Sequence, residues 1–142
     1  MVLLDTVSLM KSGISDNDYG WLKESAAVAQ SWHAAMLLVG TLEEVFLGGP
    51  AQGPNAPDTG ARERWRARYM AAVDRMRQAG INTMADPAAG FETYESLRER
   101  WDGHIVRLRA SMMYEADEID APTYCPEVVG ARPPFERRLR DV

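Results

Sequence analysis

The stretch "GFETYESLRERWDGHIVRLRASMMYE", Gly90–Glu115, decides the fold class of this protein. It contains no proline, and its apolar side chains recur every three or four positions, which places them on one face of an α-helix. They are Phe91, Tyr94, Leu97, Trp101, Ile105, Leu108 and Met112. The preceding "DP" offers Asp86 as a helix cap and Pro87 as the first helical residue. We therefore expect a long helix that buries one face against other helices, with Gly103 as a candidate kink.

The same stretch raises a catalytic alternative, because Trp101 and His104 lie one helical turn apart with Asp102 between them. Side chains two positions apart on a helix do not face each other, so Asp102 and His104 are not expected to form an acid/base pair. The rest of the chain supplies no third member of such a group. We interpret His104 as a residue at the edge of the core and expect no catalytic residue here.

Two further helices are expected upstream. The first covers about Tyr19 to Leu47, and "GGP" ends it. Its apolar positions are Leu22, Ala26, Ala29, Trp32, Met36, Val39 and Val45 or Phe46. The second begins near Asp58 or Thr59 and ends before Gly80, a residue suited to the left-handed position after a helix. Its apolar stripe consists of Trp65, Tyr69, Val73 and Met76.

These patterns predict one all-α domain over residues 1–142, a bundle of three main helices. Residues 1–14 are assigned to an N-terminal segment. Residues 48–60, rich in glycine and proline, are expected to form a flexible loop, and residues 120–142 an extended C-terminal tail.

Several features point to a cytoplasmic protein. A single cysteine, Cys125, excludes an internal disulfide framework and fits a reducing compartment. The first residues lack a basic start and reach Asp5 early, which argues against a secretory signal. The most apolar run, Ala26 to Leu42, is shorter than the roughly 20 residues that a membrane span requires, so no direct membrane span is expected.

Charge argues against nucleic-acid binding. Residues 1–60 hold two lysines and seven acidic residues, whereas residues 61–142 hold fourteen arginines and fourteen acidic residues. Four of these arginines crowd "ARERWRARYM", but residues two apart diverge on a helix and form no single basic stripe. We therefore expect a solvated helix face and no nucleic-acid partner.

The sequence also gives no strong signal for a metal site, a reactive thiol or a functional carboxylate pair. The two histidines, Cys125 and the acidic residues show no metal-ligand spacing, so neither a metal nor another cofactor is expected. Cys125 has no neighbouring histidine or lysine to lower its pKa and is interpreted as an inert thiol. Glu43 and Glu44 close an apolar helix and are expected to face solvent.

A resemblance adds to this picture. The segment "ARYMAAVDRMRQAGINTMADPAAGFETYESLRERWDGHIVRLRASMMY" combines a helix, an "AGI" stop, a "DP" start and a second helix. With the upstream "DYGWLKESAAVAQSWHAAMLLV", it resembles the cytoplasmic region that follows the pore in bacterial two-transmembrane, potassium-channel-like proteins. The likeness spans roughly Asp18 to Tyr114, and Gln30 or Ser31 stands where that family has an acidic residue. No pore helix or selectivity filter accompanies it, so the resemblance implies a soluble helical module and does not extend to ion conduction.

The sequence thus predicts a non-enzymatic cytoplasmic interaction or regulatory module. It would bind a protein partner, a membrane channel component among the candidates, or self-associate through exposed tryptophan and methionine stripes. The expected interaction residues are Trp32, His33, Trp65, Tyr69, Trp101 and Ile105. The alternative is a helical domain that senses a small molecule in a pocket near Trp32, His33 and Trp101.

Overall fold

A computed structural model describes residues 2–49 and 60–112 of the chain, and the predicted all-α class is confirmed over these residues. They form five helices rather than three: α1 (Val2–Gly13), α2 (Asp16–Lys23), α3 (Ala26–Leu47), α4 (Ala61–Gln78) and α5 (Pro87–Met112). The predicted tail over 120–142 and most of the predicted loop over 48–60 lie outside the described residues.

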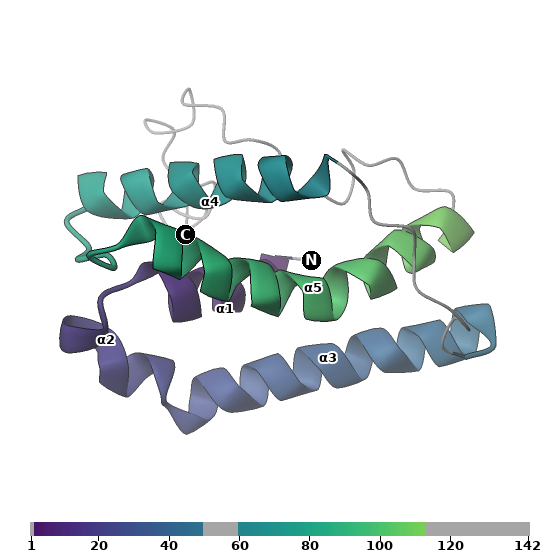
Figure 1. Cartoon of the computed structure of the whole chain (residues 1–142). Helices are drawn as coiled ribbons and strands as arrows, with labels where there is room; N and C mark the ends of the chain where they lie inside the picture. Colours follow the sequence, from purple (N-terminus) through teal and green to yellow (C-terminus); the bar gives the residue numbers. More distant parts are fainter. Residues whose placement is uncertain (1, 50–59, 113–142) are drawn as a thin grey trace, which may run out of the picture.

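Helix α5 is the central element of the bundle. It lies between α4 and α3, with α1 packed behind it (Figure 1). Helices α1 and α4 run antiparallel to α5, whereas α3 runs parallel to it (Figure 1). The short α2 crosses one end of the bundle and connects α1 to α3. The helix that decided the fold class therefore contacts three of the other four.

The N-terminal segment, residues 1–14, contains a core helix that the sequence did not reveal. In α1 the apolar Leu4 and Val7 share their buried position with the polar Asp5, Ser8 and Ser12. Both serine hydroxyls donate to the carbonyl oxygen four residues earlier, at 2.8 Å for Ser8 and 2.7 Å for Ser12. These bonds satisfy the hydroxyls inside the core. Because polar residues interrupt the buried face, its apolar period is too weak to recognise.

The helix predicted over Tyr19 to Leu47 is wrong in its extent, because two helices occupy this stretch. The chain leaves the helical conformation at Ser25, whose φ and ψ are −62° and 142°. The Ser25 hydroxyl then accepts a hydrogen bond from the Val28 amide at 3.3 Å and caps α3. A serine cap satisfies one of the free amides of a helix start, which favours a break here over a continuous helix.

The C-terminal ends of α3 and α4 and the start of α5 agree with the prediction. Gly48 and Gly80 have left-handed φ angles of 72° and 77°, after α3 and α4 respectively. Asp86 Oδ1 accepts from the Ala88 amide at 2.9 Å and Pro87 is the first residue of α5. Helix α5 continues through Gly103 without interruption. Helix α4 starts at Ala61 with Gly60 as its cap residue, and the predicted caps at positions 58 and 59 lie outside the described residues.

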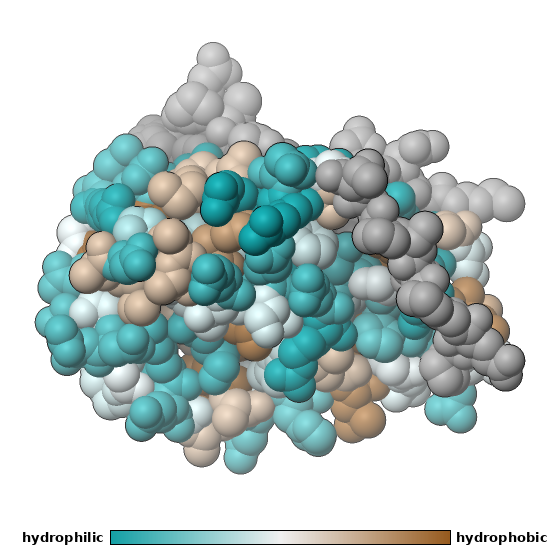
Figure 2. Space-filling model, viewed as in Figure 1, coloured by the Kyte–Doolittle hydropathy of each residue, from teal (hydrophilic) through white to brown (hydrophobic). Residues whose placement is uncertain are grey.

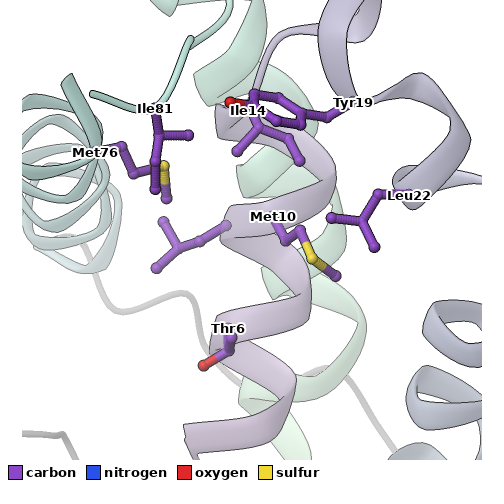
Figure 3. A pocket seen from close by; sticks show the side chains of 8 residues that line it. Thr6, Met10, Ile14, Tyr19, Leu22, Met76 and Ile81 are labelled. Carbon is purple, nitrogen blue, oxygen red and sulfur yellow. The ribbon is translucent and has the colours of Figure 1, made fainter. Parts of the chain in front are cut away.

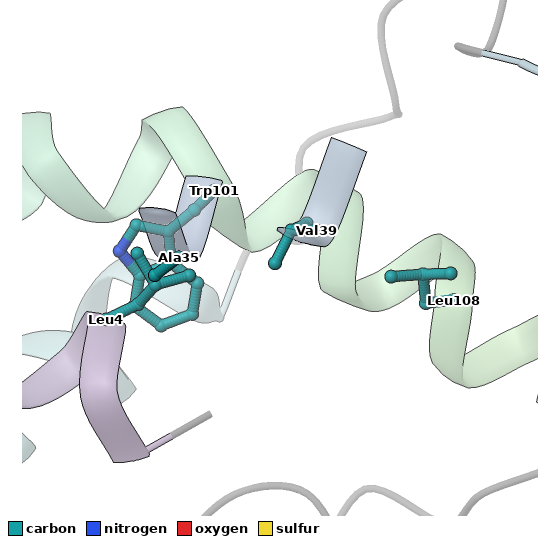
Figure 4. Close-up of a cluster of buried hydrophobic side chains, with 5 residues drawn as sticks. All are labelled: Leu4, Ala35, Val39, Trp101 and Leu108. Carbon is teal, nitrogen blue, oxygen red and sulfur yellow. The ribbon is translucent and has the colours of Figure 1, made fainter. Parts of the chain in front are cut away.

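The core has two parts. The first joins α1, α3 and α5 through Leu4, Ala35, Val39, Trp101 and Leu108 (Figure 4). The second joins α4 and α5 through Tyr69, Val73, Phe91 and Tyr94. In the second part the Tyr69 hydroxyl donates to the Ser12 carbonyl of α1 at 3.1 Å, which ties three helices together.

Candidate functional site

A buried polar group of the described residues centres on Asp5 in α1. Its Oδ1 accepts from the Tyr94 hydroxyl at 2.7 Å and from Arg98 Nη1 at 3.0 Å. Its Oδ2 accepts from Arg68 Nε at 2.9 Å. Only 6% of Asp5 and 4% of Arg98 is exposed, so the carboxylate is neutralised inside the bundle by cations from α4 and α5. One carboxylate therefore connects three helices.

Tyr94 and Arg98 both have raised pKa values in this group. Burial raises the pKa of Tyr94 well above its ordinary value. Burial alone would lower the pKa of Arg98, but Tyr94, Asp5 and Asp102 raise it overall. The Arg98 guanidinium also lies 4.5 Å from the centre of the Trp101 ring, a cation–π distance. Tyr94 therefore keeps its proton and Arg98 its charge, and the group acts as a structural connector.

A second polar group links α3 to α5. Glu43 is only 3% exposed, which corrects the prediction that both Glu43 and Glu44 face solvent; Glu44 alone does so. His104 Nδ1 lies 2.6 Å from Glu43 Oε2, and Arg107 pairs with the other carboxylate oxygen. The His104 and Arg107 side chains extend from α5 to the Glu43 carboxylate, and these contacts make its burial favourable.

The predicted separation of Asp102 and His104 is confirmed. Asp102 Oδ1 accepts from Arg98 Nε at 3.2 Å, whereas His104 turns to Glu43. Among the described residues, no set of three or more histidine, cysteine, aspartate or glutamate side chains could hold a metal ion. The ionisable side chains of the Asp5 and Glu43 groups thus connect α1, α3, α4 and α5.

An apolar cavity of about 340 Å³ lies between α1, α2 and the C-terminal end of α4 (Figure 3). It is lined by Thr6, Leu9, Met10, Ile14, Tyr19, Leu22, Met76 and Ile81. The only polar side-chain atoms in this lining are the hydroxyls of Thr6 and Tyr19. Two methionines give the walls adaptable shape. Such a cavity suits an uncharged, mainly apolar molecule.

The outer face of α3 is the other unusual feature. Its large apolar side chains are well exposed, with Leu37 at 64%, Leu38 at 59% and Val45 at 69%. Hydrophilic residues cover most of the face seen in Figure 2, and hydrophobic patches interrupt them along the lower edge, over α3. Helix α3 contains no lysine or arginine. A solvent-facing helix surface normally carries charged residues, so this face resembles one that binds another protein.

The residues predicted to mediate interaction fall into three environments. Tyr69 and Trp101 are completely buried, where a partner cannot reach them without opening the bundle. Trp32 and Ile105 pack partly buried around Trp101, and Trp65 does so around Tyr69. His33 is the exposed one, on the outer surface of α3.

The structure therefore groups these aromatic residues in the core, and the exposed leucines of α3 were not among the predicted residues. A usable signal was present in the sequence. From Ser25 to Leu42 the only ionisable side chain is that of His33, so the sequence provides no charged face to point toward solvent.

In comparisons with known proteins, no family model matches the chain, and no curated protein or solved structure is similar to it at a significant level. None of the helices in the described part of the chain is long and apolar enough to cross a membrane.

Proposed function

We propose that this chain is a non-enzymatic cytoplasmic interaction or regulatory module, similar to the soluble part of a bacterial channel-like protein. The observation that carries the proposal is the exposed apolar face of α3, built on Leu37, Leu38 and Val45. Exposed leucine and valine side chains at this density lose contact with water when a partner covers them, which drives association.

The internal use of the charged residues supports a non-enzymatic role. Asp5 is held by Arg68 and Arg98, and Glu43 by His104 and Arg107. These groups lie between helices, away from the apolar cavity, so the cavity has no acid or base from either group in its lining. A module of this kind acts by binding and not by chemical conversion.

The channel-like part of the proposal is tested with membrane fractions. Immobilised protein is incubated with detergent-solubilised membranes of the source cell, and retained membrane proteins are quantified for the wild type and for Leu37→Asp/Leu38→Asp. A control is Met70→Asp, which introduces one aspartate at an exposed apolar position of α4, on the other side of α5.

The proposal expects retention by the wild type and by Met70→Asp, and loss of retention in the double variant. Equal retention of membrane proteins by all three proteins refutes the proposal. So does the absence of retention by any of them, if the chain is also strictly monomeric.

The cavity supports a second candidate, a helical domain that senses a small apolar molecule. Its location differs from the pocket expected near Trp32, His33 and Trp101, because the lining comes from α1, α2, the end of α4 and Ile81. The test is a titration with linear alcohols and fatty acids of increasing length, followed by the tryptophan fluorescence and the melting temperature. No change in either signal up to the solubility limit of each compound rules this candidate out.

A further inference from the structure

We propose that the outer face of α3 pairs with the same face of a second copy of this chain, in an antiparallel arrangement around a two-fold axis beside Leu38. This inference rests on the proposed function and names the partner. It is carried by the surface chemistry of α3, by the positions of two ionisable residues on it, and by the size of the face.

The surface chemistry is that of a helix with one apolar, uncharged side exposed. Gln30, Ala34, Leu37 and Thr41 follow one another at intervals of four, three and four residues, so they share one side of the helix, and all are exposed. The Thr41 hydroxyl donates to the Leu37 carbonyl of its own helix at 2.9 Å. This bond leaves mainly the methyl group of Thr41 for a partner.

Two ionisable residues mark the ends of this side. His33 and Glu44 are separated by about three helical turns, which places them on the same flank of α3, about 16 Å apart along its axis. Both are exposed. The midpoint between them falls between Leu38 and Val39.

A two-fold axis through this midpoint brings an imidazole beside a carboxylate. In an antiparallel pair the axis exchanges the two ends of the helix and keeps the flank, so His33 of one copy lies beside Glu44 of the other, twice. In the alternative parallel pair the axis runs along the helices and places the two flanks on opposite sides of the interface, so His33 and Glu44 of the two copies do not meet. Only the antiparallel pair lets the His33 imidazole N–H donate to the Glu44 carboxylate of the other copy, and this pair is therefore selected.

The residues at the axis suit close contact. Leu37 and Leu38 of one copy meet the same two residues of the other. The flanking Ala34 and Gly40 are exposed and small, and they leave room for two helices to approach. A symmetric pairing of one patch with itself is the usual arrangement of homodimers.

The size of the face predicts a weak dimer. Helix α3 has 22 residues and is about 33 Å long. Contact along one helix covers less than the roughly 800 Å² per partner that a standard stable interface buries. We therefore expect a monomer–dimer equilibrium, with a Kd on the order of 100 µM, and not a permanent dimer.

The first test is sedimentation equilibrium of the full chain from about 5 µM to 1 mM, on variants whose helix content matches the wild type by circular dichroism. Leu38→Asp is expected to weaken the dimer at least tenfold, and Met70→Asp on α4 to leave it unchanged. His33→Glu brings two glutamates together and should weaken the dimer severalfold, whereas His33→Glu/Glu44→Lys restores an attractive pair and should recover the wild-type Kd within about twofold.

The second test distinguishes the orientation. In a Cys125→Ser background, single cysteines replace His33 or Glu44 and are treated with a short bismaleimide. The antiparallel pair predicts rapid cross-linking only when the two variants are mixed. Faster cross-linking of each variant with itself overturns the proposed orientation.

The outcomes also separate this inference from the proposed function. A chain that is monomeric up to 1 mM, yet retains membrane proteins in a manner lost in Leu37→Asp/Leu38→Asp, overturns the dimer and leaves the interaction module in place. A dimer that Leu38→Asp and His33→Glu do not affect overturns the assignment to α3.

Discussion

Gly90 is the position where the packing of three helices leaves the least space. It is the fourth residue of α5 and faces α1 and α4. A Cβ atom at this position would lie 2.1 Å from the Tyr69 hydroxyl oxygen and 2.8 Å from the Ser12 carbonyl oxygen. Both distances are far below van der Waals contact. Gly90→Ala must therefore displace Tyr69, break its hydrogen bond to Ser12, or move α5 away from α1.

The expected loss can be worked out from these contacts. Overpacking a core costs about 1–3 kcal/mol, and the rigid Ser12 backbone argues for the upper end, about 3 kcal/mol. Loss of the buried hydrogen bond adds about 1 kcal/mol. Alanine is favoured over glycine in a helix by about 1 kcal/mol, which offsets that term. Gly90→Ala should therefore lower the free energy of unfolding by about 3 kcal/mol.

Urea unfolding, followed by circular dichroism and tryptophan fluorescence, measures this loss. Gly40→Ala is the matched control, because the described residues leave open space at the Cβ position of Gly40 in the middle of α3. That change should stabilise the protein by up to about 1 kcal/mol. Combining Gly90→Ala with Tyr69→Phe removes the nearest clashing atom, so the two effects should add to less than their sum. A Gly90→Ala protein as stable as Gly40→Ala would refute the close packing described here.

Three further predictions concern the buried polar groups. Asp5→Ala removes the carboxylate that Arg68 and Arg98 share and leaves Asp102 as the carboxylate on Arg98, so urea unfolding should show a loss of about 3 kcal/mol. Glu43→Ala should destabilise the protein clearly more than Glu44→Ala, which is expected to stay within about 0.5 kcal/mol of the wild type because Glu44 is exposed; equal values would contradict the burial of Glu43. Burial raises the pKa of Tyr69 to about 12, so from pH 10 to about 12 the folded state retains a proton that the unfolded state loses. The free energy of unfolding should therefore fall with rising pH in this window, and less steeply in Tyr69→Phe, as measured by urea unfolding at each pH.

Local features of the sequence were sufficient to predict several helix ends. Asp86 and Pro87 start α5, Gly80 follows α4 in a left-handed conformation, and α3 ends at "GGP", as predicted. Each depends on the backbone preference of one or two residues and needs no knowledge of the rest of the chain. The long apolar stripe of α5 likewise predicted a helix that other helices must cover, and three of them do so.

Tertiary contacts decided what the sequence could not. Asp5 is buried because Arg68 and Arg98 reach it from helices more than sixty residues away in the chain, and Glu43 is buried because Arg107 and His104 do the same. From the apolar periodicity alone, such charged residues are expected to face solvent. Their burial becomes favourable only because a partner far away in the sequence contacts them in the folded chain.

By itself, therefore, the sequence determined an all-α protein, the start of α5 and the residues that end α3 and α4. Only the tertiary structure decided that residues 2–13 form a core helix, that the predicted interaction residues Tyr69 and Trp101 are enclosed, and that Leu37 and Leu38 face outward. The physical reason is that helix α3 has apolar residues on several of its sides, so more than one side could face the core. Which side becomes core depends on where the other helices pack, and that is a property of the whole chain.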